Sequence, residues 1–358
     1  MRIAVLGLGL IGGSIALASH ARVAAAQVAG YDAAPVAAQA ALGRGAIDRA
    51  ASSVAEALAG ADACFCCAPV GALPDLVAEA LAAAGPDCVV SDVGSVKRVV
   101  AASSADPRFV PGHPVAGAET AGIEHARADL FDGATWYLTP GAEASGVLYE
   151  RLHRLVAALG ASPLAIDPEA HDRLLAAVSH LPHVLANVLV SRVAGIVDAE
   201  GEGLPRVGPS FRDATRVAGA NPAIWGDIYA TNGPAIAAEL DAAVASLTEV
   251  ADALRAGDAD AIAAWGHAAR SDRARVLAAE TVDGPVHELR IVVPNRPGIV
   301  AEVARALGRA GVNIADMALA PAADMSSGAM TLSVAGDETA ARARELIEEL
   351  GFPVGVPA

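Results

Sequence analysis

The amino-acid sequence predicts an α/β chain built in three parts: a doubly wound parallel sheet, an all-helical block, and a small α+β unit at the end. Short apolar runs alternate with Ala-rich helical stretches up to about residue 165. Strand-like runs then disappear until residue 281 and return after the turn at 283–285. A length of 358 residues also exceeds what one compact core usually holds, since domains span about 100–200 residues.

The first part contains a series of strand candidates, separated by segments long enough for helical crossovers. They cover residues 3–6, 27–31, 63–68, 88–91 and 134–138. This rhythm is typical of βαβ units and therefore of a parallel sheet. The runs include the cysteines of the chain, which we expect to fill buried strands as small apolar side chains rather than to bind a metal: Cys64, Cys66, Cys67 and Cys88.

The first strand candidate leads into a glycine-rich loop that opens a helix, the context in which G-x-G-x-x-G indicates dinucleotide binding. The loop reads Gly7, Leu8, Gly9, Leu10, Ile11, Gly12. Its glycines permit a tight turn, let a pyrophosphate approach the backbone, and let helix and strand pack closely. About 20 residues further on, Asp32 ends the second strand candidate, where a carboxylate binds the ribose 2′-hydroxyl and repels a 2′-phosphate. We therefore predict a Rossmann-type domain that binds NAD rather than NADP; a structural turn with a surface Asp is the alternative.

Three loops that follow strand candidates contain polar groups at the edge where doubly wound sheets bind their ligands. They are 67–70 with Pro69, 92–97 with Ser95, and 112–117 with His113. Taken alone, His113 fits a hydrogen-bonded turn histidine better than a base. Ser95 fits the N-cap of a following helix equally well.

The helical block repeats Leu, Val, Ile and Ala at helical spacing through 174–197 and 224–254. Several helices are apolar on more than one face, which favours a helix–helix dimer interface. His180 and His183 can share a helix face, but a zinc site would need a third ligand, and none is obvious. Arg212 and Arg216 lie four residues apart with Asp213 between them, which suits either a dianionic substrate or a solvated surface.

The last part reads as a βαββα unit. We expect a strand at 287–293, a helix at 299–310 that ends at Gly311, strands at 312–319 and 329–334, and a helix at 338–350.

The charge balance limits the partners. The net charge is -16, from 41 acidic and 25 basic side chains, and the absence of a Lys/Arg cluster argues against nucleic-acid binding. We find no charge-poor run that approaches the roughly 20 strongly apolar residues of a bilayer span. The strand at residues 2–6 leaves no room for a signal segment before it. We expect a cytoplasmic protein without a membrane partner.

Together these motifs resemble the prephenate dehydrogenases of tyrosine biosynthesis, in the form with a C-terminal ACT domain. The resemblance covers nearly the whole chain and runs through residues 7–12, 92–97, 112–122, 171–172, 179–183, 211–216 and 221–225. It implies an NAD-binding domain at 1–166, a helical substrate and dimerisation domain at 167–283, and a βαββαβ-like ACT domain at 286–358. It also implies oxidative decarboxylation of prephenate to 4-hydroxyphenylpyruvate with reduction of NAD, in a homodimer and without a metal.

The resemblance also implies roles for single residues. His113 would accept the proton of the ring C4 hydroxyl as hydride leaves C4, and Ser95 would orient this pair. Arg216 would bind a substrate carboxylate and His183 the other end of the substrate. The remaining implied substrate residues are His180, Arg212, and the gating carboxylates Glu119 and Asp213. The remaining implied cofactor contacts are Leu10, Ile11 and Pro69.

In the ACT domain, two turns would bind a small amino acid, with tyrosine the expected one by feedback logic. The residues implied there are Asn295, Gly298 and Asn313. An ACT domain that only packs or dimerises is the alternative, and the sign of any effect stays open.

Two further alternatives remain. Ala118 stands where relatives often have Thr, which leaves open whether the substrate is prephenate or arogenate. A non-catalytic amino-acid sensor is a different class, but it has no use for His113. A β-hydroxyacid or imine reductase of similar build would use a Lys or Asp from the helical block, which here offers His and Arg.

Overall fold

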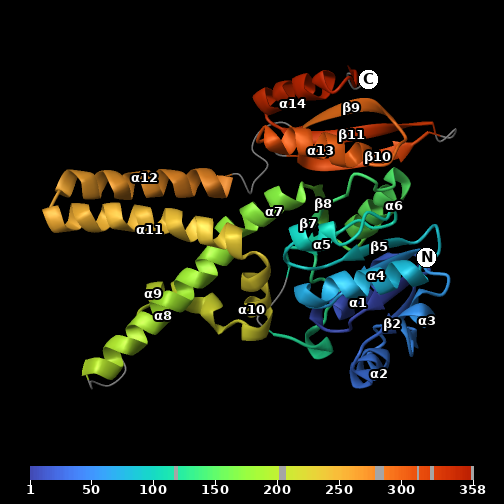
Figure 1. Ribbon diagram of the computed structural model, residues 1–358, viewed down its shortest axis with the longest axis horizontal. Helices are drawn as coiled ribbons and strands as arrows, with labels where there is room; N and C mark the ends of the chain where they lie inside the picture. The colour runs from blue at the N-terminus through green and yellow to red at the C-terminus, as the bar shows by residue number, and fades with distance from the viewer. Residues whose placement is uncertain (117–119, 201–206, 279–285, 313, 323–325, 356–358) are drawn as a thin grey trace.

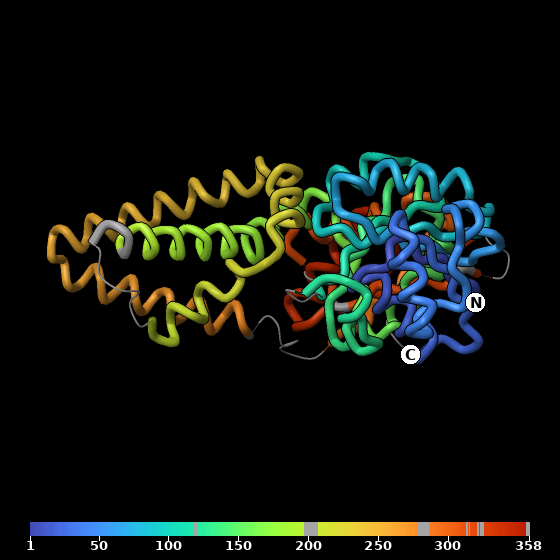
Figure 2. The backbone as a smooth tube through the Cα atoms, turned by 90° about the horizontal axis from the view of Figure 1, so that it is seen from below, coloured from blue at the N-terminus to red at the C-terminus, as the bar shows by residue number. Residues whose placement is uncertain are grey.

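The computed structural model describes residues 1–116, 120–200, 207–278, 286–312, 314–322 and 326–355. A compact body contains the Rossmann-type sheet with the C-terminal sheet packed beside it (Figure 1). Long helices extend from this body as an arm, and the second view shows the same separation (Figure 2).

The Rossmann-type sheet is parallel and has the strand order β3-β2-β1-β4-β5. Its strands are β1 Arg2–Leu6, β2 Gln27–Tyr31, β3 Arg49–Ala50, β4 Ala63–Cys66 and β5 Val89–Asp92. The helices around it are α1 Leu10–Arg22, α2 Pro35–Gly43, α3 Val54–Leu58, α4 Leu73–Ala83 and α5 Arg98–Ala102, with a 3₁₀ turn η1 Val70–Ala72. The strand order changes direction between β1 and β4, so the ligand crevice lies beyond their carboxyl ends.

Helices cover both faces of this sheet. In β1, Ile3 and Val5 belong to one apolar cluster, while Leu6 belongs to a second cluster on the other face. Side chains alternate between the faces of a strand, so a strand buried on both faces reads as one continuous apolar run. Cys64 and Cys66 in β4 fill the second cluster, as the sequence predicts.

A second sheet contains β6 Gly112–Pro114, β7 Thr135–Leu138 and β8 Ser162–Ala165. A bridge between Val90 of β5 and Phe109 lies just before β6 in the chain. β6 is antiparallel to β7, which places His113 opposite Tyr137. The sequence predicts only β7, because the short strands β6 and β8 each contain a proline and present no extended apolar run. A 3₁₀ turn η2 Ile123–His125 and the helix α6 Gly146–Ala158 complete this part.

The arm begins with a single long helix that contains one π turn. It consists of α7 Pro168–Leu175, the π turn η3 Ala176–His180, and α8 Leu181–Glu200. Its segment Pro168–Ile196 is long and apolar enough to span a membrane by length and composition alone, so the expectation that no run approaches this limit is wrong. This helix nevertheless contains buried polar side chains, His171, Asp172 and His180, which form hydrogen bonds within the protein.

The rest of the arm consists of α9 Pro209–Thr215, the 3₁₀ turn η4 Arg216–Gly219, α10 Pro222–Thr231, α11 Gly233–Ala256 and α12 Ala259–Ala278. The helix expected over 224–254 is divided in two, because Asn232 ends α10 and a proline lies in the first turn of α11. The arm exposes large apolar side chains: Val188, Leu189, Val190, Ile196, Val244, Leu247, Leu254, Trp265, Val276 and Leu277. An apolar surface of this extent is typical of an interaction surface.

The C-terminal unit is a four-stranded antiparallel sheet with two helices. The strands are β9 Val286–Pro294, β10 Ile314–Pro321, β11 Ser327–Ala335 and β12 Val354–Gly355, in the order β10-β11-β9-β12. The helices are α13 Ile299–Arg309 and α14 Asp337–Glu349. The short β12 completes the βαββαβ order of an ACT domain.

The ACT domain packs against α6 and β8 of the second sheet. A carboxylate oxygen of Glu150 accepts a hydrogen bond from the backbone N–H of Leu319 at 3.0 Å. Arg305 pairs with Asp167 at 3.1 Å, and the N–H of Gly298 donates to the carbonyl of Ala144 at 3.1 Å. These contacts join the ACT domain to the body and to the N-cap of α7.

Candidate functional site

The glycine loop after β1 has the geometry that a dinucleotide requires. Gly7 has a φ of +97°, and a Cβ there would lie 2.1 Å from the carbonyl oxygen of Cys67. A Cβ on Gly12 would lie 1.9 Å from the carbonyl oxygen of Gly7, so both positions require glycine. A Cβ on Gly9 would meet nothing within 4 Å, which leaves space for a group to approach the backbone.

The first turn of α1 offers free N–H groups to an anion. Gly9 is its N-cap and no side chain caps it, while Leu10 and Ile11 in this turn are half-buried. Asp32 ties the end of β2 to the loop: its carboxylate accepts from the N–H of Leu8 at 2.7 Å and from the N–H of Ala34 at 2.8 Å. These residues fit NAD, with the pyrophosphate at Gly9 and the ribose at Asp32.

The loop after β4 forms the other wall of this crevice. Pro69 lies exposed at the start of η1. Next to it, the N–H of Gly71 donates to the carboxylate of Asp227 in α10 at 2.8 Å. The base of the helical arm therefore contacts the cofactor edge of the sheet.

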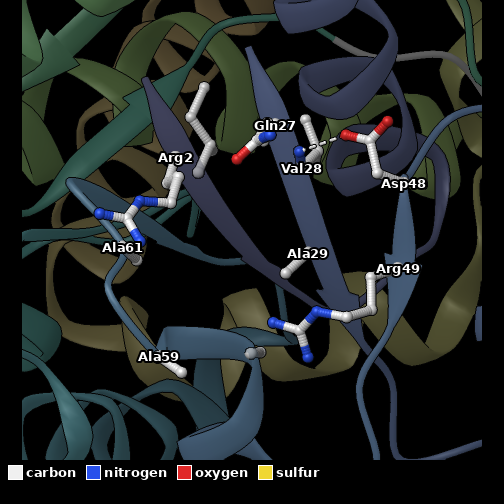
Figure 3. Close-up of a pocket in the computed structure, with 10 residues that line it drawn as sticks. Arg2, Gln27, Val28, Ala29, Asp48, Arg49, Ala59 and Ala61 are labelled. Carbon is white, nitrogen blue, oxygen red and sulfur yellow. Dashed lines mark hydrogen bonds between the residues drawn. The ribbon is translucent and has the colours of Figure 1, made fainter.

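A cavity of about 390 Å³ lies elsewhere, and Figure 3 shows its lining. Arg2, Gln27 and Arg49 line it, and they lie at the amino ends of β1, β2 and β3. Because the glycine loop follows the carboxyl end of β1, this cavity belongs to the opposite edge of the sheet. It is not part of the candidate site.

His113 lies in β6 with 7% of its surface exposed. Its Nδ1 is 2.8 Å from Nε2 of His171, and its Nε2 bonds to none of the residues that the structure describes. Burial lowers the pKa of His113 well below its usual value, and the neighbouring His171 and Lys97 lower it further. The ring is therefore neutral at pH 7, the form that can accept a proton.

Ser95 lies half-buried in the loop after β5. It does not cap α5, because that helix begins at Arg98 with Lys97 in the N-cap position. Within the described part of the chain, Ser95 forms no hydrogen bond, including none to His113.

Two fully buried charged residues fix the strand of His113, and the sequence reasoning gives them no role. Lys97 pairs with the carboxylate of Asp92 and donates to the carbonyl of Gly112 at 2.7 Å. Asp92 also accepts from the N–H of Gly112 at 3.1 Å. Burial lowers the pKa of Lys97, and Asp92 opposes that shift. The sequence does contain a signal for this pair: Lys97 follows a buried strand that ends in Asp92. A Lys is almost never fully buried without a partner, so this Asp is the expected partner.

His171 and Asp172, noted in the sequence only as part of a motif, lie directly behind His113. Asp167 caps the helix α7 that positions them. Asp172 accepts from Nδ1 of His171 at 2.8 Å and from the backbone N–H groups of Lys97 and Arg98 at 2.7 and 2.9 Å. Burial lowers the pKa of His171, while Asp172 opposes that shift.

The π turn brings His180 into the same group. The side-chain amide of Asn232 lies 3.2 Å from Nδ1 of His180 and donates to the carbonyl of Asp172 at 2.9 Å. Burial lowers the pKa of His180 to about 4. Asn232 is a further site residue that the sequence reasoning does not single out.

His183 lies in an aromatic cluster one turn further along. Its ring stacks on Trp225 at a centroid distance of 3.5 Å and an interplanar angle of 4°. Its Nδ1 bonds to the hydroxyl of Tyr229 and lies 3.2 Å from the side-chain amide of Asn187. Burial lowers the pKa of His183, and the nearby backbone of Val217 in η4 opposes that shift.

The charged residues of α9 and η4 are exposed. They are Arg212, Asp213 and Arg216. Arg216 immediately precedes Val217, so η4 brings it to the edge of the His183 cluster. Glu119 lies outside the described residues.

In the ACT domain, Gly298 has a φ of +78°, and a Cβ there would lie 1.9 Å from the carbonyl oxygen of Ala142. The N–H of Asn295 donates to the carbonyl of Ser326 at 3.1 Å. Asn313 lies outside the described residues. The expected effector turn at 295–298 therefore contacts a loop of the body.

Comparisons with known proteins agree along the whole chain. Residues 15–163 match the family model "Prephenate dehydrogenase, nucleotide-binding domain", 167–266 match "Prephenate dehydrogenase, dimerization domain", and 287–352 match "ACT domain". A prephenate dehydrogenase of Bacillus subtilis is 29% identical over 354 residues, which cover 97% of this chain and 95% of that one. A cyclohexadienyl dehydrogenase of Zymomonas mobilis is 34% identical over 279 residues, 76% of this chain and 94% of that one.

A solved structure has the same fold. It is the prephenate dehydrogenase from A. aeolicus in complex with hydroxyphenyl propionate and NAD+. It matches with a TM-score of 0.70 and 26% identity, covering 77% of this chain and 98% of that one.

Proposed function

The chain belongs to the prephenate dehydrogenase family, in the form with a C-terminal ACT domain, and from this premise we propose that it converts prephenate to 4-hydroxyphenylpyruvate in tyrosine biosynthesis. Membership in this family makes it an NAD-dependent dehydrogenase. What we propose beyond this is its substrate, its pathway and its regulation. The relatives that match along its length are biosynthetic enzymes, and we infer a cytoplasmic location from them.

The neutral, buried ring of His113 is the observation that supports this reaction. Prephenate has a hydroxyl on ring C4 and a carboxylate on ring C1. His113 takes the hydroxyl proton at Nε2, and NAD held at the glycine loop would supply the acceptor for the hydride that leaves C4. The C1 carboxylate then leaves as CO2, and its bonding electrons complete the aromatic ring. The phenol oxygen of the product takes back the proton that His113 held.

The substrate is held between the body and the arm. Arg216 binds one carboxylate as a bidentate partner, and His183 binds the other end of the molecule. His180, Arg212 and Asp213 complete the substrate contacts together with Glu119, and Ser95 orients the hydroxyl toward His113. The exposed charges of α9 suit this role, because binding an anion there brings the substrate against the His183 cluster.

We propose that two chains pair through their arms. The arm exposes large apolar side chains such as Leu247, Leu254 and Trp265, and the family model that matches this region is named a dimerization domain. A second arm would cover this surface and shield the substrate residues of α9. Sedimentation of the purified protein tests the pairing, with a dimer expected.

The activity test supplies purified protein with prephenate and NAD and follows NADH absorbance. Formation of NADH and 4-hydroxyphenylpyruvate is expected. A parallel assay with arogenate, which has an amino group in place of the keto group, decides the preference. Turnover of arogenate alone would replace prephenate as the substrate, and turnover of neither would reject the proposed function.

We further propose that tyrosine binds the ACT domain and inhibits the enzyme. A cavity of about 330 Å³ lies where this domain contacts the body, lined in part by Ala142, Arg296, Gly298 and Glu302. Its size suits a free amino acid, and its lining includes the ion pair of Arg296 and Glu302.

The regulatory test compares the full chain with a chain that ends near Asp283. Tyrosine is expected to inhibit the full chain and to leave the shortened one active at the same concentrations. Equal inhibition of both would place tyrosine in the active site as a product mimic and reject the ACT proposal.

A further inference from the structure

We propose that Asp172, His171 and His113 form a proton relay, in which His113 takes the substrate proton while the positive charge is passed to His171 beside Asp172. Of these three residues, only His113 contacts the substrate, so His171 and Asp172 are positioning residues. The inference rests on the proposed function for its reaction, but its geometry is independent of the substrate.

The hydrogen bonds determine the tautomers of both rings. The carboxylate of Asp172 can only accept, so Nδ1 of His171, at 2.8 Å, must donate to it. Nε2 of a neutral His171 is then an acceptor, and Nδ1 of His113, at 2.8 Å, must donate to it. Nε2 of His113 is thereby left with its lone pair. The relay thus selects the nitrogen that acts as the base.

Asp172 is held in place by groups that do not titrate. It accepts from the backbone N–H groups of Lys97 and Arg98 at 2.7 and 2.9 Å. Its own carbonyl accepts from Asn232 at 2.9 Å, and its surface is 3% exposed. These bonds prevent rotation of the carboxylate away from His171. They also connect the relay to the loop that contains Ser95.

The relay solves an energetic problem of the buried base. Burial, His171 and Lys97 all lower the pKa of His113, so an imidazolium confined to His113 would be costly. When Nε2 of His113 gains the substrate proton, its Nδ1 proton can move to Nε2 of His171. The charge then rests on His171, which is hydrogen-bonded to the Asp172 carboxylate. Reversal of both transfers returns a proton to the phenol oxygen, so no proton is gained or lost.

The variant His171→Gln tests the relay, because a Gln amide can accept from Nδ1 of His113 but cannot take up a proton. We expect kcat to fall about 10²-fold with KM for prephenate within about threefold of the parent value. The solvent-isotope dependence of kcat should be curved in the parent, where two protons move, and linear in the variant. His20→Gln is the matched control, since His20 lies on α1 and pairs with Asp48, and it should retain the parent kcat and curvature.

A second measurement needs no turnover. The nitrogen-15 NMR shifts of the ring nitrogens report the tautomers in the resting protein at about pH 7. We expect both His113 and His171 with the proton on Nδ1. A proton on Nε2 of His113 would reject the relay, as would an unchanged kcat or a curved isotope dependence in His171→Gln. If the variant does not fold, the tautomers of His113 and His171 in the parent protein decide whether the relay exists. An inactive parent with the expected tautomers would reject the proposed reaction and leave the relay geometry intact.

Discussion

The two halves of the candidate site differ in burial within a single chain. Around His113, the base, its hydrogen-bond partners and the Lys97–Asp92 pair are all buried. On α9 and η4, Arg212 and Arg216 are exposed. The proton-handling half is therefore preorganised and desolvated before substrate arrives, whereas the anion-binding half remains solvated until substrate, or a second arm, covers it.

This difference has an electrostatic reason. A neutral histidine can be buried at modest cost if its nitrogens are hydrogen-bonded, but an unpaired guanidinium in the interior is far more costly. Arginines that bind a doubly negative substrate are therefore best kept at the surface. The comparison implies that changes at His113 affect turnover and that changes at Arg216 affect substrate binding.

The largest effect is expected for His113→Asn. It removes the proton acceptor and keeps a polar side chain, so kcat should fall about 10²–10⁴-fold while KM changes little. Steady-state NADH formation measures both constants. An unchanged kcat would remove His113 from the reaction and overturn the assignment of the buried half.

The next effect concerns stability against pH. Burial lowers the pKa of His113, His171, His180 and His183, so below about pH 6.5 the unfolded chain binds more protons than the folded one. The free energy of unfolding must then fall as the pH falls. With its pKa of about 4, His180 alone contributes a loss of about 3 kcal/mol between about pH 6.5 and pH 4.

Urea unfolding across this range measures the loss, and His180→Gln should flatten the slope. A free energy of unfolding that stays constant from about pH 6.5 to pH 4.5 would show that these rings are not buried in neutral form.

A smaller effect is expected for Arg216→Ala. Loss of a carboxylate partner should cost about 2 kcal/mol, the lower end for charged pairs because Arg216 lies exposed, or about a 30-fold decrease in kcat/KM. The decrease should appear mainly in KM. Arg173→Ala removes an exposed arginine that pairs with Glu169 on α7, and it should leave kcat/KM unchanged. If Arg216→Ala and Arg173→Ala had the same kcat/KM, Arg216 would lie outside the substrate site.

Most of the fold is readable from the sequence because apolar runs and glycine loops are local signals. The runs at β1, β2, β4, β5 and β7 are predicted within a few residues. The strand β6 is three residues long and contains a proline, so it has no run to detect. It forms because Gly112 is fixed by Asp92 and Lys97, residues that precede it by a whole loop.

The site is only partly readable, for a similar reason. His113, His180 and His183 can be chosen from the sequence, but the bond from His113 to His171 spans 58 residues and leaves no local pattern. The π turn adds a second obstacle. Residues nine apart in an uninterrupted α-helix face opposite sides, so regular periodicity separates His171 from His180. The wide turn at 176–180 reduces that rotation and lets Asn232 contact both Asp172 and His180.

At the junction of the ACT domain and the body, the backbone of Gly298 lies so close to the Ala142 carbonyl that even a Cβ would not fit between them. For the proposed effector to reach the backbone of this glycine, the 142–144 loop would have to move, so effector binding would separate the two domains at this contact. By thermodynamic reciprocity, any change that tightens the body against this turn would then weaken binding of the proposed effector. An added methyl group at position 298 would force the same displacement of the 142–144 loop without any bound molecule.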